Sequence, residues 1–373
     1  MKNLLATPEI NFQPPEFGSQ QSMACAQSTQ RVNGAFNTGA GGRHIVSSDA
    51  GGSRPKRVGI ARMAEKSAKL RDRTGVQYFA LPAHTALNRE SSGRMPFAWT
   101  LNPYRGCEFG CKYCYARYTH EFLELRDGRD FERKIFAKLG SPDILRAELR
   151  QARDRGLPIA LGTATDPYQP AEKQFQITRR MLEVFREFEG IDFSITTKST
   201  LVLRDLDLLR PIAQQHHFSV HITVTTVDAR LARRIEPKAP PPLKRLEAVK
   251  ALVDAGIRAG VNAAPVLPGL TDSPSQLERL ARAAAEHHAR FFFVNVLFLM
   301  PSAKAQFMPF LEKEYPHLAW RYRRLYQNSA YLSKQYKDDI EKLTGELRER
   351  YGLAGSHEEH RLARHYEQLA LDL

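Results

Sequence analysis

The sequence predicts an α/β fold in which short strands alternate with helices. Six short apolar runs occur between residues 98 and 298, and longer segments separate them. These segments carry apolar residues at spacings of three and four, which is the period of an amphipathic helix. Helix start and stop residues, such as Ser273-Pro274 and Gly256, stand at the expected ends of the segments. Together these observations predict strands that are each followed by a helix.

The expected elements follow one another in a regular order. Strands are predicted over residues 98–104, 158–162, 192–197, 218–226, 258–264 and 291–298. Helices are predicted over residues 171–189, 309–326 and 331–351. Ser141-Pro142 and Ser273-Pro274 each provide an N-cap followed by proline at the first helical position, so a helix is also expected to begin at each.

The alternation of strands and helices implies parallel strand pairing through right-handed crossovers. Six repeats are too few for a closed eight-stranded barrel. A doubly wound sheet and an open partial barrel both fit, and the periodicity alone does not choose between them. In either architecture the chemistry is expected at the carboxyl ends of the strands.

Composition and charge limit the class of protein. The 373 residues are 42% hydrophobic and 26% charged, which excludes disorder throughout. The formal net charge of +14 favours a polyanionic partner, nucleic acid before membrane. The longest apolar stretch, residues 291–300, is far shorter than the roughly 20 residues that span a bilayer. No apolar region long enough for a signal peptide follows Lys2, so we expect a cytoplasmic protein.

Composition and apolar patterning predict that the chain has three parts. Residues 1–90 are expected to form a flexible basic head, because the first 60 residues hold eight of the 23 glycines and little periodic apolar pattern. Residues 91–300 hold the alternating strands and helices and are expected to form the core. Residues 301–373 are expected to form a helical extension.

The most informative residues are three cysteines that directly follow the first predicted strand. Cys107, Cys111 and Cys114 are spaced as C-x3-C-x2-C, with glycines at 106 and 110 that suit a tight loop. Three soft thiolates suit an iron–sulfur cluster or zinc. Zinc needs a fourth ligand, for which His120 is the candidate. A four-iron cluster held by three thiolates keeps one iron open to a further ligand.

This loop, with Tyr113 directly before the last cysteine, resembles the cluster loop of the radical S-adenosylmethionine (SAM) superfamily. Several further motifs resemble the group related to spore photoproduct lyase. They are Cys-Xaa-Tyr-Cys-Tyr-Ala, Thr165-Asp166-Pro167-Tyr168-Gln169-Pro170-Ala171-Glu172, Thr196-Thr197-Lys198 and Ile235-Glu236-Pro237. The resemblance implies a partial (βα)6 radical SAM barrel, which would resolve the choice of architecture.

The resemblance also implies cofactors and their ligands. Cys107, Cys111 and Cys114 would bind three irons of a [4Fe–4S] cluster, and S-adenosylmethionine would chelate the fourth. One electron from the cluster would cleave the sulfonium and produce a radical that abstracts hydrogen from the substrate. Tyr113 is expected against the adenine. Four polar residues at later strand ends are expected to contact the rest of the cofactor: Thr165, Asp166, Lys198 and Asn262. A flavodoxin or ferredoxin would donate the electron.

The substrate is the least defined part of this interpretation. The resemblance and the charge favour nucleic acid, with a basic run after the fourth strand as the phosphate-contacting candidate: Arg230, Arg233, Arg234, Lys238, Lys244 and Arg245. The only cysteine outside the motif is Cys25, so no extra thiol stands near the motif to return a hydrogen atom to product, and the catalytic residues stay unassigned. The alternatives are a zinc-stabilised nucleic-acid-binding module without catalysis and a radical SAM enzyme acting on a protein or small molecule.

Overall fold

A computed structural model describes residues 57–73, 75–90, 95–125, 127–154 and 157–355. Its main feature is a seven-stranded sheet in the order β11-β10-β9-β8-β7-β4-β3. The strands are β3 (Leu87–Arg89), β4 (Trp99–Leu101), β7 (Ile159–Leu161), β8 (Asp192–Thr197), β9 (His217–Thr223), β10 (Ala259–Val266) and β11 (Phe292–Val296).

Six strands of this sheet, from β4 to β11, pair in parallel. Only β3 pairs antiparallel, on the outer edge of β4. Since β3 and β11 are the two ends of the order and do not pair with each other, the sheet is open. The predicted partial barrel of six parallel strands is confirmed, and the doubly wound alternative is set aside because the parallel strands follow one another in chain order without a reversal.

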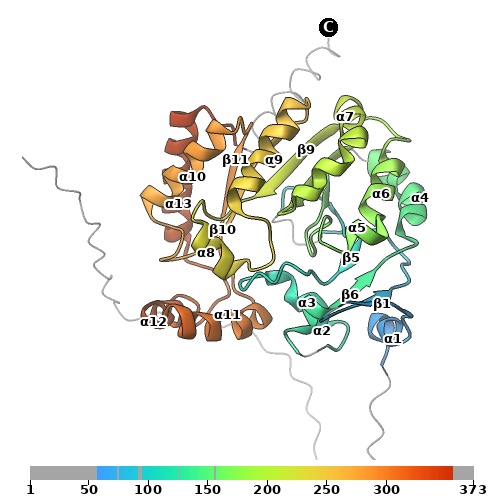
Figure 1. Ribbon diagram of the computed structural model, residues 1–373, viewed down its shortest axis with the longest axis horizontal. Coiled ribbons are helices and arrows are strands. Elements are labelled where there is room, and N and C mark those ends of the chain that lie inside the picture. Colours follow the sequence, from blue (N-terminus) through green and yellow to red (C-terminus); the bar gives the residue numbers. More distant parts are fainter. Residues whose placement is uncertain (1–56, 74, 91–94, 126, 155–156, 356–373) are drawn as a thin grey trace, which may run out of the picture. The chain divides into compact units, whose positions relative to one another are not determined.

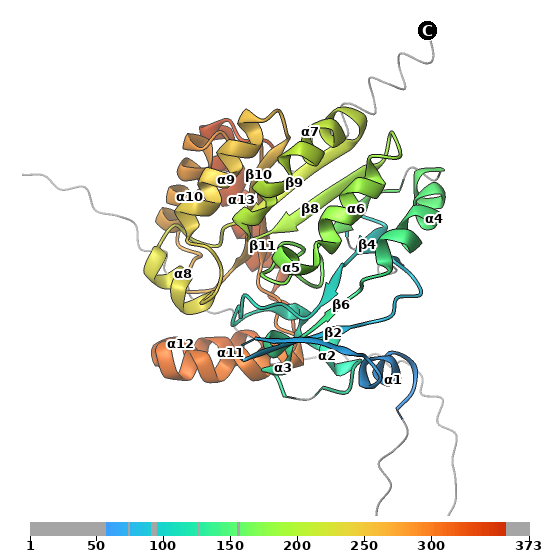
Figure 2. The ribbon, with the colours of Figure 1, turned by 45° about the vertical axis from the view of Figure 1, so that its right-hand side comes forward.

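Helices follow the parallel strands and pack on the outer side of the sheet (Figures 1 and 2). They are α4 (Ser141–Asp154), α5 (Glu172–Phe175), α6 (Ile177–Phe185), α7 (Leu206–Gln215), α8 (Ala229–Ile235), α9 (Pro242–Asp254), α10 (Pro274–Glu286) and α13 (Lys334–Tyr351). The predicted start of α10 is confirmed, since Ser273 forms a capping box with Gln276. The helix predicted over 171–189 is divided into α5 and α6, because Gln176 adopts a left-handed conformation with φ 49°.

A second sheet has the order β1-β2-β6-β5. Its strands are β1 (Lys69–Arg73), β2 (Val76–Ala80), β5 (Tyr104–Arg105) and β6 (Lys134–Ala137). The strand predicted over 98–104 is therefore wrong in extent. It is interrupted at Asn102-Pro103, so that β4 belongs to the main sheet and β5 to the second one.

Part of the stretch predicted as a flexible head has regular structure. Helix α1 (Gly59–Glu65) and strands β1 to β3 all precede residue 91. Strand β2 pairs in parallel with β6, and its Val76 and Tyr78 are buried. These two apolar side chains explain why residues 76–80 are ordered despite their polar surroundings. Residues 1–56 of the predicted head lie outside the described residues, and the three-part division of the chain stays a prediction.

Three helices cover residues 301 to 351. They are α11 (Pro301–Glu314), α12 (Pro316–Leu325) and α13. The first two replace the single helix predicted over 309–326. Helix α11 ends before Tyr315, and Pro316 occupies the first position of α12. None of the helices in the described residues is both long and apolar enough to cross a membrane.

Candidate functional site

The three cysteines lie on a tight loop that leaves β5. Gly106 and Gly110 have φ angles of +83° and +68°, as the loop requires. A Cβ atom on Gly106 would approach the carbonyl oxygens of Phe131 and Lys134 to 2.9 Å, so only glycine fits there. The Cys107 and Cys111 side chains are buried, and Cys114 is half-buried. The local sequence thus forces three thiols onto one short, largely covered segment.

Two side chains from the segment after β7 form hydrogen bonds with the backbone of this loop. The Thr165 hydroxyl donates a 2.6 Å hydrogen bond to the carbonyl of Gly106, and Gln169 Nε2 donates another of 3.0 Å to the same oxygen. Gln169 Oε1 accepts from the backbone N–H of Glu108 at 3.0 Å, and its side chain is fully buried. Gln169 therefore forms hydrogen bonds with the backbone on both sides of Cys107. The motif at residues 165–172 contains Gln169, but its pattern did not predict this role.

Arg117 supports the other end of the loop. Its guanidinium donates to the carbonyl oxygen of Cys111 at 2.9 Å and to the Glu132 carboxylate at 2.5 Å. The arginine is buried, and its positive charge partly offsets the rise that burial causes in the pKa of Cys114. No motif singled out this residue, because its partners Gly128 and Glu132 lie 11 and 15 residues further along the chain.

The thiols are close enough to influence one another. Burial raises the pKa of all three, and it raises that of Cys111 to about 12. For Cys107 the negative charges of Asp166, Cys111 and Cys114 raise the pKa further. The free thiols are therefore protonated at neutral pH. Binding of a metal cluster would have to displace these protons, since only thiolates are ligands.

Three thiols on one loop are a soft donor set, which suits an iron–sulfur cluster. In the described part of the chain, no three Cys, His, Asp or Glu side chains are arranged to hold a single metal ion. The three thiolates of a cluster bind different irons and so need not converge on one point. The proposed fourth zinc ligand, His120, bonds the Lys134 carbonyl at 3.0 Å and packs edge-on against Phe131 and Phe136. The Nε2 atom of His120 is therefore engaged by the backbone of β6.

A buried charge network adjoins the cysteine loop. Glu236, directly after α8, forms a 2.6 Å ion pair with Arg245, and both side chains are almost completely buried. Tyr113 donates a hydrogen bond to the same carboxylate, and Lys198 Nζ lies 3.8 Å from it. The Lys198 ammonium also stands 5.8 Å from the centre of the Tyr113 ring. Two predicted cofactor residues, Tyr113 and Lys198, are thus brought together around Glu236.

Burial opposes ionisation of Glu236, but the positive charges of Arg245 and Lys198 lower the pKa of Glu236 below its ordinary value. Burial raises the pKa of Tyr113, and the Glu236 charge adds to the rise. The carboxylate is therefore ionised and the phenol neutral at pH 7. Arg245, predicted as part of a basic surface run, is buried and does not lie on the surface. Its guanidinium pairs with Glu236 and donates hydrogen bonds to the carbonyls of Pro240 and Thr223.

Asp166 fastens the second strand end to the third. Its carboxylate accepts from the Thr197 hydroxyl at 2.6 Å and from the backbone N–H groups of Tyr168 and Lys198 at 2.9 and 2.7 Å. These bonds place Lys198 at the end of β8. They give Asp166 a positioning role, and its predicted contact with the cofactor stays a prediction, as does that of Thr165.

Asn262 differs from the other predicted residues. It lies on β10, where its backbone pairs with Thr223 of β9 and Phe293 of β11. Its side-chain oxygen is buried and has no hydrogen-bond partner among the described residues. A buried polar atom left without a partner costs free energy, so this oxygen is free to accept a hydrogen bond from a water or a ligand. Of the predicted cofactor residues, Asn262 is the one with an orphaned buried acceptor.

The comparisons with known proteins agree with this geometry. Residues 101–283 match the family model described as the radical SAM superfamily. The chain belongs to the radical SAM superfamily. The match spans the cysteine loop and the strands from β7 to β10. It therefore supports an enzyme, and it implies both S-adenosylmethionine and an iron–sulfur cluster as cofactors.

Several relatives of this radical SAM chain are similar over most of their length. An uncharacterized protein of Mycobacterium bovis is 36% identical over 303 residues, which cover 81% of this chain and 88% of the relative. An uncharacterized protein of Methanocaldococcus jannaschii is 28% identical over 242 residues, which cover 65% of this chain and 84% of the relative.

Solved structures of spore photoproduct lyase share the fold. A mutant of that enzyme aligns with a TM-score of 0.56 at 15% identity, covering 80% of this chain and 84% of the other. The complex of the enzyme with dinucleoside spore photoproduct aligns with a TM-score of 0.55 at 14% identity over the same shares. The fold resemblance stated from the sequence is thereby confirmed.

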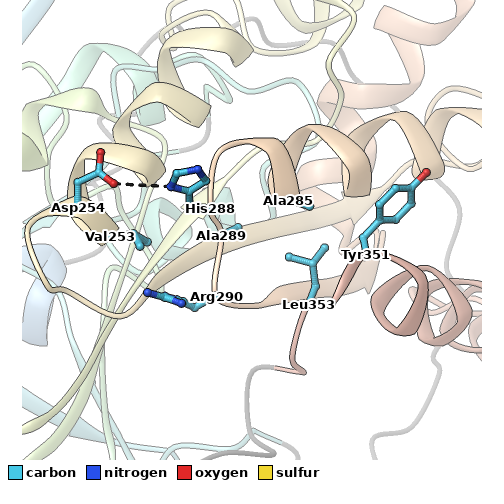
Figure 3. Close-up of a pocket in the computed structure, with 9 residues that line it drawn as sticks. Val253, Asp254, Ala285, His288, Ala289, Arg290, Tyr351 and Leu353 are labelled. Carbon is cyan, nitrogen blue, oxygen red and sulfur yellow. Dashed lines mark ion pairs between the residues drawn. The ribbon is translucent and has the colours of Figure 1, made fainter.

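A pocket of about 380 Å³ lies away from this site (Figure 3). It is lined by residues that precede β10 and β11 and by the end of α13, which places it at the amino ends of the strands. Two of its lining residues, His288 and Asp254, form an ion pair at 3.7 Å. None of the predicted site residues lines it, so it is separate from the cysteine site.

Proposed function

We propose that this radical SAM enzyme holds a [4Fe–4S] cluster on Cys107, Cys111 and Cys114 and acts on nucleic acid. The observation that carries the first half is the buried three-cysteine loop, fixed through Gly106 by Thr165 and Gln169. Such a cluster, with S-adenosylmethionine on its open iron, supplies a radical that takes a hydrogen atom from the substrate.

The chain's own residues would bind and orient the cofactor. Lys198, held at the strand end by Asp166, offers an ammonium group that suits the methionine carboxylate. The buried Asn262 oxygen can accept a hydrogen bond from the ribose or amino group. Tyr113, fixed by Glu236, presents its ring beside Lys198 and would pack against the adenine. The thiols on the loop would lose their protons as the cluster binds.

Charge supports the choice of nucleic acid. The chain carries +14 at pH 7, and Arg230, Arg233, Arg234, Lys238 and Lys244 are exposed on and after α8, beyond the end of β9. One solved structure with this fold contains a dinucleoside photoproduct, as its description states. A flavodoxin or ferredoxin would provide the electron. A protein or small-molecule substrate is the competing proposal, and the compartment we infer is the cytoplasm.

Reconstitution tests the cofactor half. The protein is loaded anaerobically with iron and sulfide, reduced, and examined by electron paramagnetic resonance and by chromatography of S-adenosylmethionine products. We expect a cluster signal, with 5′-deoxyadenosine and methionine as products. Cys114→Ala should abolish both, whereas Cys25→Ala, which changes the cysteine outside the motif, should abolish neither. Stoichiometric zinc uptake with intact S-adenosylmethionine would support the zinc-binding alternative instead.

Isotope transfer tests the substrate half. The reconstituted enzyme is incubated with uniformly deuterated DNA, RNA and peptide pools, and the 5′-deoxyadenosine is analysed by mass spectrometry. We expect deuterium to appear in 5′-deoxyadenosine with a nucleic-acid pool. Transfer from the peptide pool alone would replace nucleic acid with protein as the substrate and leave the cofactor assignment standing.

A further inference from the structure

A hollow lies between α8 and the start of α12. It has a volume of about 320 Å³ and is lined by Asp228, Arg230, Leu231, Arg234, Gly269, Leu270, Tyr315 and His317. Figures 1 and 2 both show α8 facing α11 and α12. Its walls follow β9, β10 and β11, so the hollow opens at the carboxyl ends of the strands, the same side as the cysteine loop.

Two arginines and a histidine around this hollow have side chains that are available to a ligand. Arg230 and His317 are exposed, and neither side chain has a charged or hydrogen-bonding partner among the described residues. Arg234 is 3.8 Å from Glu314, a loose pair in which its side chain keeps 54% of its surface exposed. The one acidic lining residue, Asp228, uses its carboxylate to accept from the N–H groups of Arg230 and Leu231. The Asp228 carboxylate is thus engaged by the start of α8, which leaves the Arg230 and Arg234 guanidinium groups to contact an anion.

The floor and one wall are apolar or aromatic. Leu270 is buried and Leu231 half-buried. The Tyr315 ring lies under the Arg234 guanidinium at 5.9 Å, and the His317 ring is 6.5 Å from it. At Gly269, a side chain would meet Leu318 at 2.9 Å, so the glycine lets the loop close against α12. Cationic groups beside an aromatic wall match a phosphate attached to a planar base.

We infer that this α8–α12 hollow binds one nucleotide unit of a single-stranded nucleic acid, with phosphate on Arg230 and Arg234 and the base against Tyr315 and His317. The volume lies at the lower end of ligand sites, about 300–1,000 Å³, which suits one nucleotide. The inference rests on the proposed nucleic-acid substrate and assigns it a surface. A strand anchored here would continue along the same edge of the sheet toward the cysteine loop.

Binding measurements with the full-length reconstituted enzyme test this site. A fluorescein-labelled 12-nucleotide single-stranded DNA is titrated at several salt concentrations and followed by anisotropy. The variant R230Q/R234Q should weaken binding about tenfold and reduce the steepness of the log–log salt dependence by about 0.7, the value for one phosphate neutralised on a single strand. H317A, at an exposed position, should weaken binding about fivefold through lost stacking.

The matched control removes the same charge elsewhere. R279Q/R282Q changes two exposed arginines of α10 and should alter the affinity less than twofold. Equal weakening by both double variants would show diffuse attraction and overturn the inference. Equally tight binding of a free mononucleotide would identify a nucleotide site instead of a strand site, and tighter binding of an acidic peptide would also overturn it. Cleavage of S-adenosylmethionine by the wild type is measured separately. If cleavage occurs but the strand does not bind, this site is wrong and the cofactor assignment stands.

Discussion

Gln169 Nε2 lies 3.0 Å from the carbonyl oxygen of Gly106, the residue that precedes the first cysteine. The same side chain accepts from the N–H of Glu108, the residue that follows that cysteine. One amide thus fixes the backbone on both sides of Cys107. This relationship connects the segment after β7 to the cysteine loop, and it makes the ligand position depend on a residue that does not itself bind metal.

Gln169→Leu should therefore loosen the loop. The substitution leaves the Glu108 N–H buried and without its acceptor, which costs about 1–3 kcal/mol of unfolding free energy. We expect the iron content per chain after reconstitution to fall as well. Denaturant titration and iron analysis measure the two effects. Gln174→Leu, at an exposed residue of α5, is the control and should change neither. Full iron content in Gln169→Leu would show that the cysteines hold their positions unaided.

Glu236→Gln should be strongly destabilising. It leaves the Arg245 guanidinium buried without its negative partner, which costs about 3–5 kcal/mol. The pair itself is close, at 2.6 Å, with both side chains buried. Thermal unfolding of Glu236→Gln, Arg245→Met and the double variant measures the coupling. We expect the double variant to be more stable than the sum of the single losses predicts, and additive losses would contradict a direct interaction.

Lys198→Ala should weaken binding of S-adenosylmethionine by about 1.5–3 kcal/mol, because one charge-assisted hydrogen bond is lost. Calorimetric titration of the reconstituted enzyme measures the affinity. Lys244→Ala is the matched control, since that lysine is exposed and pairs with Glu247 on the surface of α9. If the affinity of Lys198→Ala is unchanged with the cluster intact, Lys198 pairs with Glu236 and does not contact S-adenosylmethionine.

His120 should make stability depend on pH below neutrality. Burial lowers the pKa of His120 from 6.5 to about 4. The unfolded chain therefore takes up this proton first, and stability falls as the pH drops from about 6.5 to about 4, by up to about 3 kcal/mol for this group. Above pH 7 the group contributes no further change. His120→Gln should flatten the fall, as denaturant titrations between pH 7.5 and 4 will measure. An identical slope in His120→Gln would contradict the neutral buried imidazole.

The parts of the fold that local pattern encodes were predictable. The strand predicted over 192–197 coincides with β8, and the spacing of the cysteines located their loop. The second sheet was not predicted, because its strands are short and β2 and β6 come from segments more than 50 residues apart. Gln169 and Glu108 are 61 residues apart, and Tyr113 and Glu236 are 123 apart. Such partners are brought together only by strand order, which no local pattern contains.

A substitution at Asn262 should change the affinity for S-adenosylmethionine without lowering the stability of the fold. Its buried side-chain oxygen has no partner among the described residues, so it contributes no bond that a substitution would break. Asn262→Leu should leave the unfolding free energy unchanged or raise it, because an unsatisfied buried polar atom is removed. The same variant should lose affinity for S-adenosylmethionine, since the orphaned acceptor is the group we assign to the cofactor.

Asn102→Leu is the matched comparison for this test. Asn102 Oδ1 accepts from the N–H of Ala164 at 2.8 Å, and its Nδ2 donates to the Thr163 hydroxyl at 3.0 Å. Its loss should cost about 1–3 kcal/mol of stability, because these partners are left without it. Chemical denaturation and S-adenosylmethionine titration are run on both variants. If Asn262→Leu were destabilised as much as Asn102→Leu, with affinity unchanged, Asn262 would be a structural residue of β10 and the cofactor would have to be held by other groups.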